Sequence, residues 1–440
     1  MKSPCSGRAG AVRRGDDVVS VSLKPELARC ARSGSPRWYT IPGYGIWLLA
    51  LCAGCGAGGL AFPDGGAWPA AVAPPYSAEA RLCLTDDGDD TLAIVSTAAA
   101  PAVFGFAPVG DLPLEIEGPH HLAASPDGKL LYVNLSRYAP GAGGGPSGAV
   151  GTGSARGRLL QIDAATYRTR AEVTVDRDPG DVILTRDGRT ALVSHYDLIA
   201  LQTQLEQGLP AAAGYSTIAI VDTTTMAAPT LVPVCATAHG LALSADEKTL
   251  YVACSLADEL AVVDLATRAV KLVVLGPAAG PPGSPSYFPY AVTVSPSDGS
   301  VWVSCNGSSN GWSGLRVYDP KTSAMDDARA LRLPGIPMFG GWLPDGKTLV
   351  LPQQGIERVS LVDTTSSTEI AQIDVPDTAC LRAHMIALAA DGERAWLSCE
   401  GDHVARRGTL VALGIAERAI LGFTTVGLFP DGVVLLPPAP

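Results

Sequence analysis

A short turn motif centred on aspartate recurs along the chain and limits the possible folds more than any other feature. The motif occurs seven times, and a glycine follows the aspartate in most copies. Its aspartates are Asp127, Asp187, Asp246, Asp298, Asp345, Asp391 and Asp431, at successive spacings of 60, 59, 52, 47, 46 and 40 residues. A self-similar unit repeated at such a period predicts a radial or solenoid array of structural repeats.

The repeat unit consists of four short apolar runs separated by turn residues. The copy around Asp246 contains the runs 240–244, 249–255, 259–264 and 269–275, which are rich in Val and Leu. Runs of this length and composition predict β-strands, and Asp-Gly suits the hairpin between the first two. Four strands per repeat predict a propeller blade.

The third strand of the repeat usually ends in aspartate. An aspartate at that position can bond the backbone two residues further on, which starts the turn to strand four. We interpret these side chains as structural; they are Asp163, Asp222, Asp264, Asp319 and Asp363.

The two ends of the repeat region predict how the ring closes. The last motif, at Asp431, is followed only by the apolar run 433–437, which leaves a blade with its inner two strands. Residues 91–97 and 102–109 form strands three and four without partners. Joining the two halves completes a seventh blade and removes exposed sheet edges. The sequence therefore predicts an all-β, seven-bladed β-propeller of four-stranded blades, with the last blade closed by strands from both termini.

The string Ser-Pro-Asp-Gly-Lys-Leu-Leu-Tyr-Val at 125–133, with later strands ending in Val-Asp or Ile-Asp, resembles the YVTN-type, YncE-like β-propeller repeat proteins of bacterial envelopes. The resemblance covers roughly residues 80–440 and implies this WD40-like fold and an envelope location. It implies no particular function, since unrelated activities share the fold.

The N-terminal segment resembles an export signal. Residues 1–37 carry eight Lys/Arg and three Asp/Glu, and an apolar stretch at 44–53 follows them. The stretch ends at Ala53-Gly54-Cys55, which resembles a lipobox and predicts lipidation of Cys55. We therefore divide the chain into a basic extension with a lipoprotein signal (1–55), a Gly/Ala/Pro-rich tether (56–79) and the propeller (80–440). An exported protein, lipid-anchored in the periplasm or on the outer surface, is expected, with an ordinary signal peptide as the alternative.

The charge balance limits the partners. The chain carries 32 Lys/Arg and 43 Asp/Glu, a formal net charge of −11, and no basic stripe is evident. Nucleic acid is therefore not expected as a partner. We expect a monomer that meets the membrane only through a lipid at Cys55.

Four cysteines form two pairs with the same spacing. Cys235 and Cys254 are 19 residues apart, as are Cys380 and Cys399, and each first cysteine precedes an inner strand. In an oxidising compartment this predicts two intra-blade disulfides, Cys235–Cys254 and Cys380–Cys399. The alternative is a pair of soft metal sites that also use His239 and His384. The sequence assigns no partner to Cys83 or Cys305.

The repeat also aligns several polar side chains at the start of the inner strands. Counting five residues back from the last residue of each inner strand gives His120, Gly180, His239, Tyr290, Met338, His384 and Thr424. The first residues of inner strands lie at one mouth of the central channel. The sequence therefore predicts a ligand-binding hub mouth formed by His120, His239, Tyr290, Met338 and His384. A structural alternative is that these residues only bond the backbone near the turn.

Three functions remain open on the sequence. We expect a binding or scaffold protein that recognises a protein, peptide or glycan through long loops on the same face, without catalysis, metal or cofactor. A lactonase-type hydrolase is the first alternative, although no carboxylate visibly pairs with the hub histidines. A copper or redox-associated propeller with a His/Met hub is the second. The acidic run Asp86-Asp87-Gly88-Asp89-Asp90 is interpreted as a solvated turn.

Overall fold

The computed structural model of this protein describes residues 79–110, 117–136, 156–197, 215–277, 286–307 and 312–438, together with residue 207 and three short strand pairs. The short pairs are β1 (Ala11–Arg14) with β2 (Asp17–Ser20), β3 (Tyr39–Thr40) with β4 (Trp47–Leu48), and β10 (Tyr138–Ala139) with β11 (Val150–Gly151). The chain divides into two units, Met1–Gly65 and Gly66–Pro440. The second unit contains the propeller. No helix in the described residues is long and apolar enough to cross a membrane.

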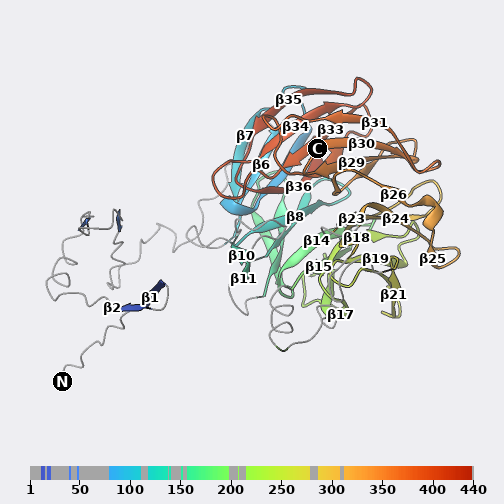
Figure 1. The fold of residues 1–440 in the computed structure, drawn as a ribbon, viewed down its shortest axis with the longest axis horizontal. Helices are drawn as coiled ribbons and strands as arrows, with labels where there is room; N and C mark the ends of the chain where they lie inside the picture. Colours follow the sequence, from blue (N-terminus) through green and yellow to red (C-terminus); the bar gives the residue numbers. More distant parts are fainter. Residues whose placement is uncertain are drawn as a thin grey trace. The chain divides into compact units, whose positions relative to one another are not determined.

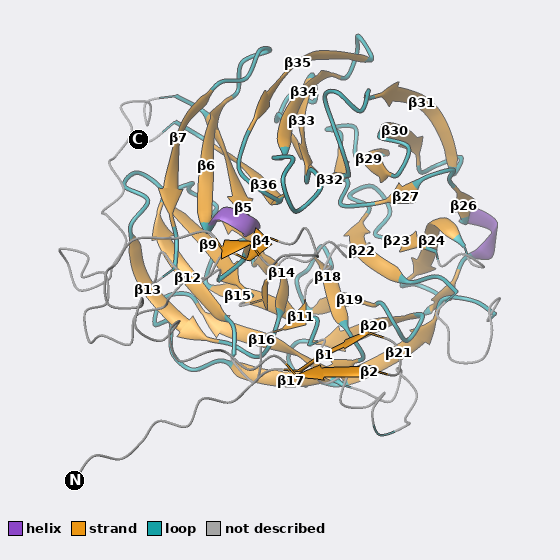
Figure 2. Ribbon diagram, turned by 60° about the vertical axis from the view of Figure 1, so that its left-hand side comes forward, coloured by secondary structure: helices purple, strands orange, loops and turns teal. Residues whose placement is uncertain are grey.

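Seven antiparallel sheets are arranged around a central axis, which confirms the predicted seven-bladed β-propeller (Figures 1 and 2). Blades one to three are regular four-stranded sheets. From the innermost strand outward, blade one consists of β8 (Pro119–Ala124), β9 (Leu130–Leu135), β12 (Arg158–Asp163) and β13 (Thr169–Thr174). Blade two consists of β14 (Pro179–Leu184), β15 (Thr190–His195), β16 (Ser216–Asp222) and β17 (Thr230–Cys235). Blade three consists of β18 (Ala238–Leu243), β19 (Thr249–Cys254), β20 (Glu259–Asp264) and β21 (Val270–Val274).

Blades four and five each have one interrupted strand, whereas blade six is regular. In blade four the outermost position is shared by two short strands around the 3-10 turn η4 (Asp327–Arg329), and in blade five the innermost position is shared by two. Blade four consists of β22 (Pro289–Val294), β23 (Val301–Asn306), β24 (Ser313–Asp319), β25 (Ala324–Met325) and β26 (Leu331–Arg332). Blade five consists of β27 (Ile336–Pro337), β28 (Gly341–Trp342), β29 (Thr348–Gln354), β30 (Arg358–Asp363) and β31 (Thr368–Asp374). Blade six consists of β32 (Ala383–Leu388), β33 (Arg394–Cys399), β34 (Thr409–Gly414) and β35 (Ala419–Thr425).

Blade seven joins both ends of the propeller, but not in the predicted proportions. Its innermost strand is β36 (Pro430–Leu436), and the other three are β5 (Arg81–Asp86), β6 (Thr91–Ser96) and β7 (Val103–Pro108). The prediction of two strands from each end was therefore wrong, since one strand comes from the C-terminal segment and three from the N-terminal segment. The reason is that the last Asp-Gly pair does not form a turn. Asp431 and Gly432 lie inside β36, which pairs directly with β5.

The other six motif copies form the predicted hairpin turns. In each, the aspartate carboxylate accepts a hydrogen bond from a backbone N–H two residues later, as Asp127 does from Lys129 and Asp345 from Lys347. The glycine at these turns adopts a positive φ, for example 68° at Gly128, which a side chain would disfavour. The strand-three aspartates are also structural as predicted, because each accepts backbone N–H bonds within its own turn.

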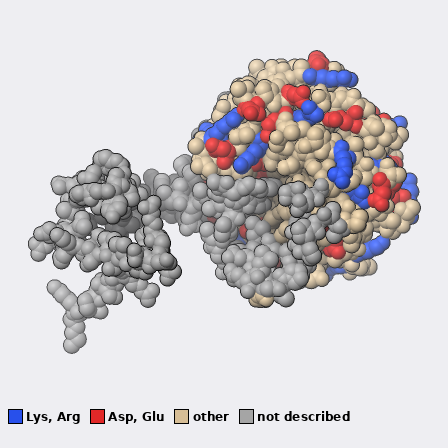
Figure 3. All heavy atoms as spheres, viewed as in Figure 1, with Lys and Arg blue, Asp and Glu red and all other residues tan. Residues whose placement is uncertain are grey.

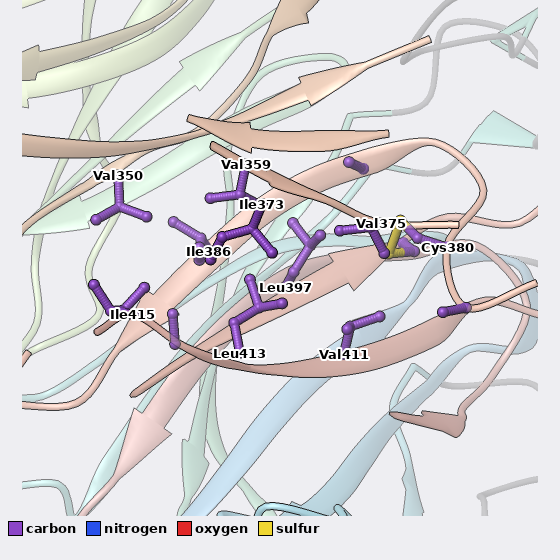
Figure 4. Close-up of a cluster of buried hydrophobic side chains, with 14 of the residues drawn as sticks. Val350, Val359, Ile373, Val375, Cys380, Ile386, Leu397, Val411, Leu413 and Ile415 are labelled. Atoms are coloured by element: carbon purple, nitrogen blue, oxygen red, sulfur yellow. A yellow bond between two sulfur atoms is a disulfide. The ribbon is translucent and has the colours of Figure 1, made fainter. Parts of the chain in front are cut away.

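Neighbouring blades pack through apolar side chains between their sheets. Figure 4 shows one such layer, in which Val350, Val359 and Ile373 of blade five face Leu397 and Leu413 of blade six. Alternation along each strand sends one set of side chains to each neighbouring blade. The apolar core therefore lies between blades, and the central axis is left to the first residues of the inner strands.

Both predicted disulfides are formed, but one of them links two blades rather than lying within one. Cys235 is the last residue of β17 in blade two and is bonded to Cys254 of blade three. This bridge is therefore inter-blade rather than intra-blade. Cys380 lies in the connection that enters blade six and is bonded to Cys399 of that blade. Because all four thiols are bridged, the alternative of two Cys-His-Cys metal sites is excluded.

Cys83 and Cys305 are the described cysteines outside a disulfide. Both are buried. Burial raises the pKa of each thiol, so both behave as core residues rather than as reactive thiols.

Carboxylates in the turn between strands two and three hold the connection to the next blade. The Asp258 carboxylate accepts hydrogen bonds from the backbone N–H groups of Ser286, Tyr287 (2.9 Å) and Phe288 (2.8 Å), just before β22. Asp90 binds the N–H groups of Glu117 and Gly118 before β8 in the same way. These carboxylates fix where the inner strands begin.

We expect replacement of Asp258 to destabilise the propeller. Asp258→Gly keeps the positive φ of 56° accessible but removes the acceptor for three backbone N–H groups, which should lower the free energy of unfolding by about 2–3 kcal/mol. Asp258→Asn tolerates the same φ and keeps the carbonyl acceptor for Tyr287 and Phe288, but it turns an amide NH2 group toward the Ser286 N–H, so its loss should be smaller, about 1 kcal/mol. Denaturant unfolding of the two variants measures the difference. Equal losses would contradict this role of the carboxylate.

Candidate functional site

Polar side chains gather where the seven inner strands begin. The second residue of an inner strand, or the residue directly after β27 in blade five, faces the axis in every blade. These residues are His120, Gly180, His239, Tyr290, Met338, His384 and Asp431. All the side chains among them are buried, with at most 1% exposure. We call this set, with the neighbouring His121, Asp181, Phe339 and Glu400, the hub cluster.

Asp431 is one of the hub residues that the sequence analysis missed, together with His121, Asp181, Phe339 and Glu400. The repeat count placed Thr424 at the seventh position, but Thr424 lies on the outermost strand of blade six, and Asp431 takes the hub position. Asp431 had been interpreted as a hairpin aspartate because its Pro-Asp-Gly string matches the turn motif. The one signal against that interpretation is that the apolar run after Gly432 is followed directly by Pro437 and Pro438, which do not favour a further strand.

Asp431 lies between two histidines. Its Oδ2 is 2.8 Å from Nδ1 of His120, and its Oδ1 contacts Nδ1 of His384. Burial opposes protonation of His120, but the carboxylates of Asp431 and Asp87 raise its pKa to about 10. Burial would raise the pKa of Asp431, yet the charges of His120 and His384 hold it well below its usual range. The lactonase alternative had found no carboxylate paired with the hub histidines, and this observation corrects that point.

A second carboxylate orients His121. Nδ1 of His121 lies 3.0 Å from Oδ1 of Asp181, which is the next residue after Gly180 on β14. Asp181 is itself fixed, because it accepts backbone N–H bonds from Val182 and Leu241. Burial lowers the pKa of His121, and the hydrogen bond to Asp181 offsets this only in part. Because a carboxylate oxygen accepts hydrogen bonds, Nδ1 of His121 carries the hydrogen that is directed at Asp181.

The remaining predicted residues complete the ring on the side of blades three and four. Nε2 of His239 is 3.4 Å from Nε2 of His120, and its ring stacks on Tyr290 at a centroid distance of 4.1 Å. The Tyr290 hydroxyl is 3.4 Å from Nε2 of His384. A Cβ at Gly180 would lie only 3.0 Å from the His239 ring, so glycine leaves room for this imidazole.

Met338 occupies its expected position but not the expected surroundings. Its sulfur is 4.0 Å from Nδ2 of Asn306. The ring of the next residue, Phe339, instead contacts the rings of His121, His239, Tyr290 and His384. The structure thus brings together four of the predicted residues, His120, His239, Tyr290 and His384. The ring of Phe339 packs against this cluster in place of the Met338 thioether.

Two groups of side chains in the hub cluster have the spacing of metal ligands. One donor atom from each of His120, His121 and Asp431 lies within 4.8 Å of the others, and the same holds for His384, Glu400 and Asp431. Glu400 follows β33 and is hydrogen-bonded to His403 (2.5 Å) and Gln354 (3.0 Å). Asp431 belongs to both groups.

The acidic run at residues 86–90 is not the solvated turn that the sequence suggested. Asp86, Asp87 and Asp90 are buried, and η2 (Asp87–Asp89) directs Asp87 to within 3.6 Å of His120. Burial raises the pKa of Asp86 to about 8 and that of Asp90 to about 7. The run folds inward because it connects β5 and β6 beside β36, at the point where the ring closes.

Several predictions fall outside the described residues. These are lipidation at Cys55 and most of the long loops on the hub face, at 137–157, 198–214, 276–289 and 306–313. Over the described part of the face drawn in Figure 3, basic and acidic side chains are interspersed.

Fold and hub together define a class, the seven-bladed β-propellers, here with a buried polar cluster at the axis. No family model matches the sequence, and no curated protein matches it. Solved structures do match. A functionally unknown protein from Desulfotomaculum acetoxidans is 12% identical, with 82% of this chain and 99% of that chain covered and a TM-score of 0.59.

A periplasmic gluconolactonase from Pseudomonas aeruginosa is 16% identical, with the same coverage and a TM-score of 0.58. Kuenenia stuttgartiensis hydrazine synthase is 17% identical, covering 73% of this chain and 90% of that chain, with a TM-score of 0.53. At these identities the likeness shows the fold alone, and the fold is compatible with binding and with hydrolase functions.

We expect Asp431→Ala to be strongly destabilising. The change removes the carboxylate that two buried histidines share, and an uncompensated buried charge typically costs about 3–5 kcal/mol of unfolding free energy. Asp391→Ala is the matched control, because Asp391 belongs to the same sequence motif but lies in an exposed turn of blade six and should cost about 1 kcal/mol or less. Denaturant unfolding measures both. A loss at Asp431 no larger than at Asp391 would show that the buried ion pairs contribute little.

Proposed function

We propose that this chain is an exported binding protein whose propeller takes up a small cationic ligand in the hub cluster. One observation carries the proposal. The carboxylate of Asp431 is fully buried at the axis, where both of its oxygens face imidazoles from different blades. A buried carboxylate requires compensation. Here imidazoles provide it, and a ligand cation can take over that role.

The charges around Asp431 favour a cation over an anion. Three carboxyl groups, those of Asp181, Glu400 and Asp431, are buried in the cluster. In the part of the chain that the structure describes, their basic partners are histidines, and no lysine or arginine forms an ion pair with them. An imidazole can give up its proton when a cation arrives, whereas lysine or arginine would stay charged and compete.

Recognition of a protein, peptide or glycan by the loops of the hub face remains a further proposal. The hub cluster lies at the end of the inner strands where those loops begin, so loops and hub belong to one face. A lipid at Cys55 would hold this face in the cell envelope.

Thermal unfolding of the full chain in the presence of cations tests the proposal. The probes are Zn²⁺, Ca²⁺, choline and spermidine, each titrated separately. A probe that binds the folded state should raise the unfolding midpoint, since ligand at 100 times its dissociation constant adds about 2.7 kcal/mol. Asp431→Asn keeps the shape of the side chain but removes its charge and should abolish the shift.

Asp391→Asn should leave the shift unchanged. If no probe raises the midpoint of the native chain, or if the Asp431→Asn variant responds as the native chain does, the proposal is wrong.

A hydrolase of the lactonase type is the second candidate. The observation in its favour is the series Asp431–His384–Tyr290, in which a carboxylate contacts one ring nitrogen and a hydroxyl approaches the other. Such a series orients an imidazole for general acid–base catalysis. The propeller of the periplasmic gluconolactonase supports this candidate only at the level of the fold.

If the hub hydrolyses lactones, replacing His384 should reduce turnover. We expect His384→Gln to lower kcat on glucono-δ-lactone by about 10²–10⁴-fold, the usual contribution of a general acid or base. Proton release in a pH-stat, corrected for spontaneous hydrolysis, measures the rate. No release above that background by the native chain would remove this candidate.

A further inference from the structure

We infer that the cation of the hub cluster is a divalent transition-metal ion, held by His120, His121 and Asp431. Asp181 is the residue that positions His121. This inference rests on the proposed function, because it names the chemical class of the cation. It also revises the sequence-based expectation that the chain carries no metal.

The three side chains come from two inner strands that the ring brings together. His120 and His121 are consecutive on β8, and Asp431 is on β36 of the neighbouring blade seven. Consecutive residues of a regular strand point to opposite faces, yet these two imidazoles are stacked, with a centroid distance of 4.6 Å. The register of β8 shifts between Pro119 and Leu122, and this irregularity turns both rings toward Asp431.

The strongest evidence is the unpartnered nitrogen of His121. Its Nδ1–H is directed at the Asp181 carboxylate, which leaves a lone pair on Nε2. That nitrogen is buried, has no hydrogen-bond partner in the described structure, and lies 3.9 Å from Oδ1 of Asp431. His121 Nε2 and Asp431 Oδ1, two buried atoms that each carry a lone pair, therefore face each other. A positive ion between them relieves this contact.

The distance fits a coordinated metal. A nitrogen and an oxygen bound to one zinc ion at about 2.0–2.2 Å each lie about 3.4 Å apart in a tetrahedral site and at most about 4.2 Å apart. The 3.9 Å between His121 Nε2 and Asp431 Oδ1 falls within this limit, and a shift of about 0.5 Å gives the tetrahedral spacing. A donor atom of His120 also lies within 4.8 Å of the donor atoms of His121 and Asp431. His120 supplies the third ligand once the proton that it shares with the Asp431 carboxylate is displaced by the metal.

The donor set indicates the class of metal. Two imidazoles and one carboxylate match the three-ligand zinc sites that leave a position open for water or substrate. Calcium and magnesium prefer six or more oxygen ligands and are poorly served by imidazole. A carboxylate on the far nitrogen of a ligating histidine is also the usual arrangement at such sites, and Asp181 occupies that place.

The second group, His384, Glu400 and Asp431, is the weaker candidate. Glu400 already pairs with His403 and Gln354. This group offers one imidazole and two carboxylates, a donor set that favours a transition metal less than two imidazoles and one carboxylate do.

Metal uptake by the chelator-treated full chain tests the inference. The chain is dialysed against Zn²⁺, and bound metal is counted by plasma mass spectrometry. In parallel, Co²⁺ is titrated and its visible d–d absorption recorded. We expect the native chain to retain one more equivalent of zinc than the His121→Asn variant. Because cysteines lie outside the described residues, thiolate-bound cobalt is recognised by its intense near-ultraviolet band, which should be the same in both proteins.

Two further variants separate the roles. Asp181→Asn should retain the site but weaken zinc about 10–100-fold and shift the cobalt bands, because His121 loses its orientation. Asp391→Asn, in an exposed turn, should bind as the native chain does. An unchanged affinity and spectrum in Asp181→Asn would overturn the positioning role.

Other outcomes overturn the assignment of the site. If Glu400→Gln loses the equivalent and His121→Asn keeps it, the metal sits in the second group. If zinc uptake by the native chain equals that of His121→Asn while choline or spermidine still raises the unfolding midpoint, the metal inference fails and the proposed cation binding stands. If no cation of either kind acts through Asp431, both fail.

Discussion

The pairing of β36 with β5 is the contact on which the rest of the propeller depends. It joins Val433 to Leu84 and Leu436 to Arg81, so that residues about 350 positions apart become neighbours in one sheet. The buried guanidinium of Arg81 reinforces this closure, since it donates to the Tyr167 hydroxyl (2.7 Å) and the Ala164 carbonyl (2.6 Å) of blade one and to the Pro437 carbonyl (3.3 Å). The closure supplies blade seven with its innermost strand and so completes its four-stranded sheet.

The hub cluster is a product of the same closure. Asp431 reaches the axis because β36 is the innermost strand of blade seven, and Asp87 approaches His120 because η2 connects the two strands beside it. His120 and His384 therefore share the Asp431 carboxylate only when β36 takes the innermost place in blade seven. Ring closure and the assembly of this part of the polar site depend on the same strand. A mutation that loosens β36 is expected to act on both.

The repeat allowed the fold to be predicted almost completely, whereas the site was predicted only in part. Periodic turns and alternating apolar residues are local signals, and they gave the blade count, six of the seven turns and both cysteine pairs. His120, His239, Tyr290 and His384 were found because they occupy one repeat position. Asp431 and Asp181 were missed for different reasons. Asp431 lies in a string that matches the turn motif, but that string is part of strand β36. Asp181 reaches the hub cluster because a bulge turns consecutive residues of the inner strand β14 toward the axis.

The composition of the hub is itself an argument for a ligand. The layers between blades are filled by Val, Leu, Ile and Ala, which bury apolar surface without any requirement for partners. At the axis the same fold carries carboxylates and imidazoles, several of whose buried atoms lack hydrogen bonds in the described structure, among them His121 Nε2 and His239 Nδ1. Replacing buried ion pairs by apolar residues often leaves stability unchanged or raises it. Folding alone therefore does not account for this cluster, whereas the cation that we propose would supply the missing partner.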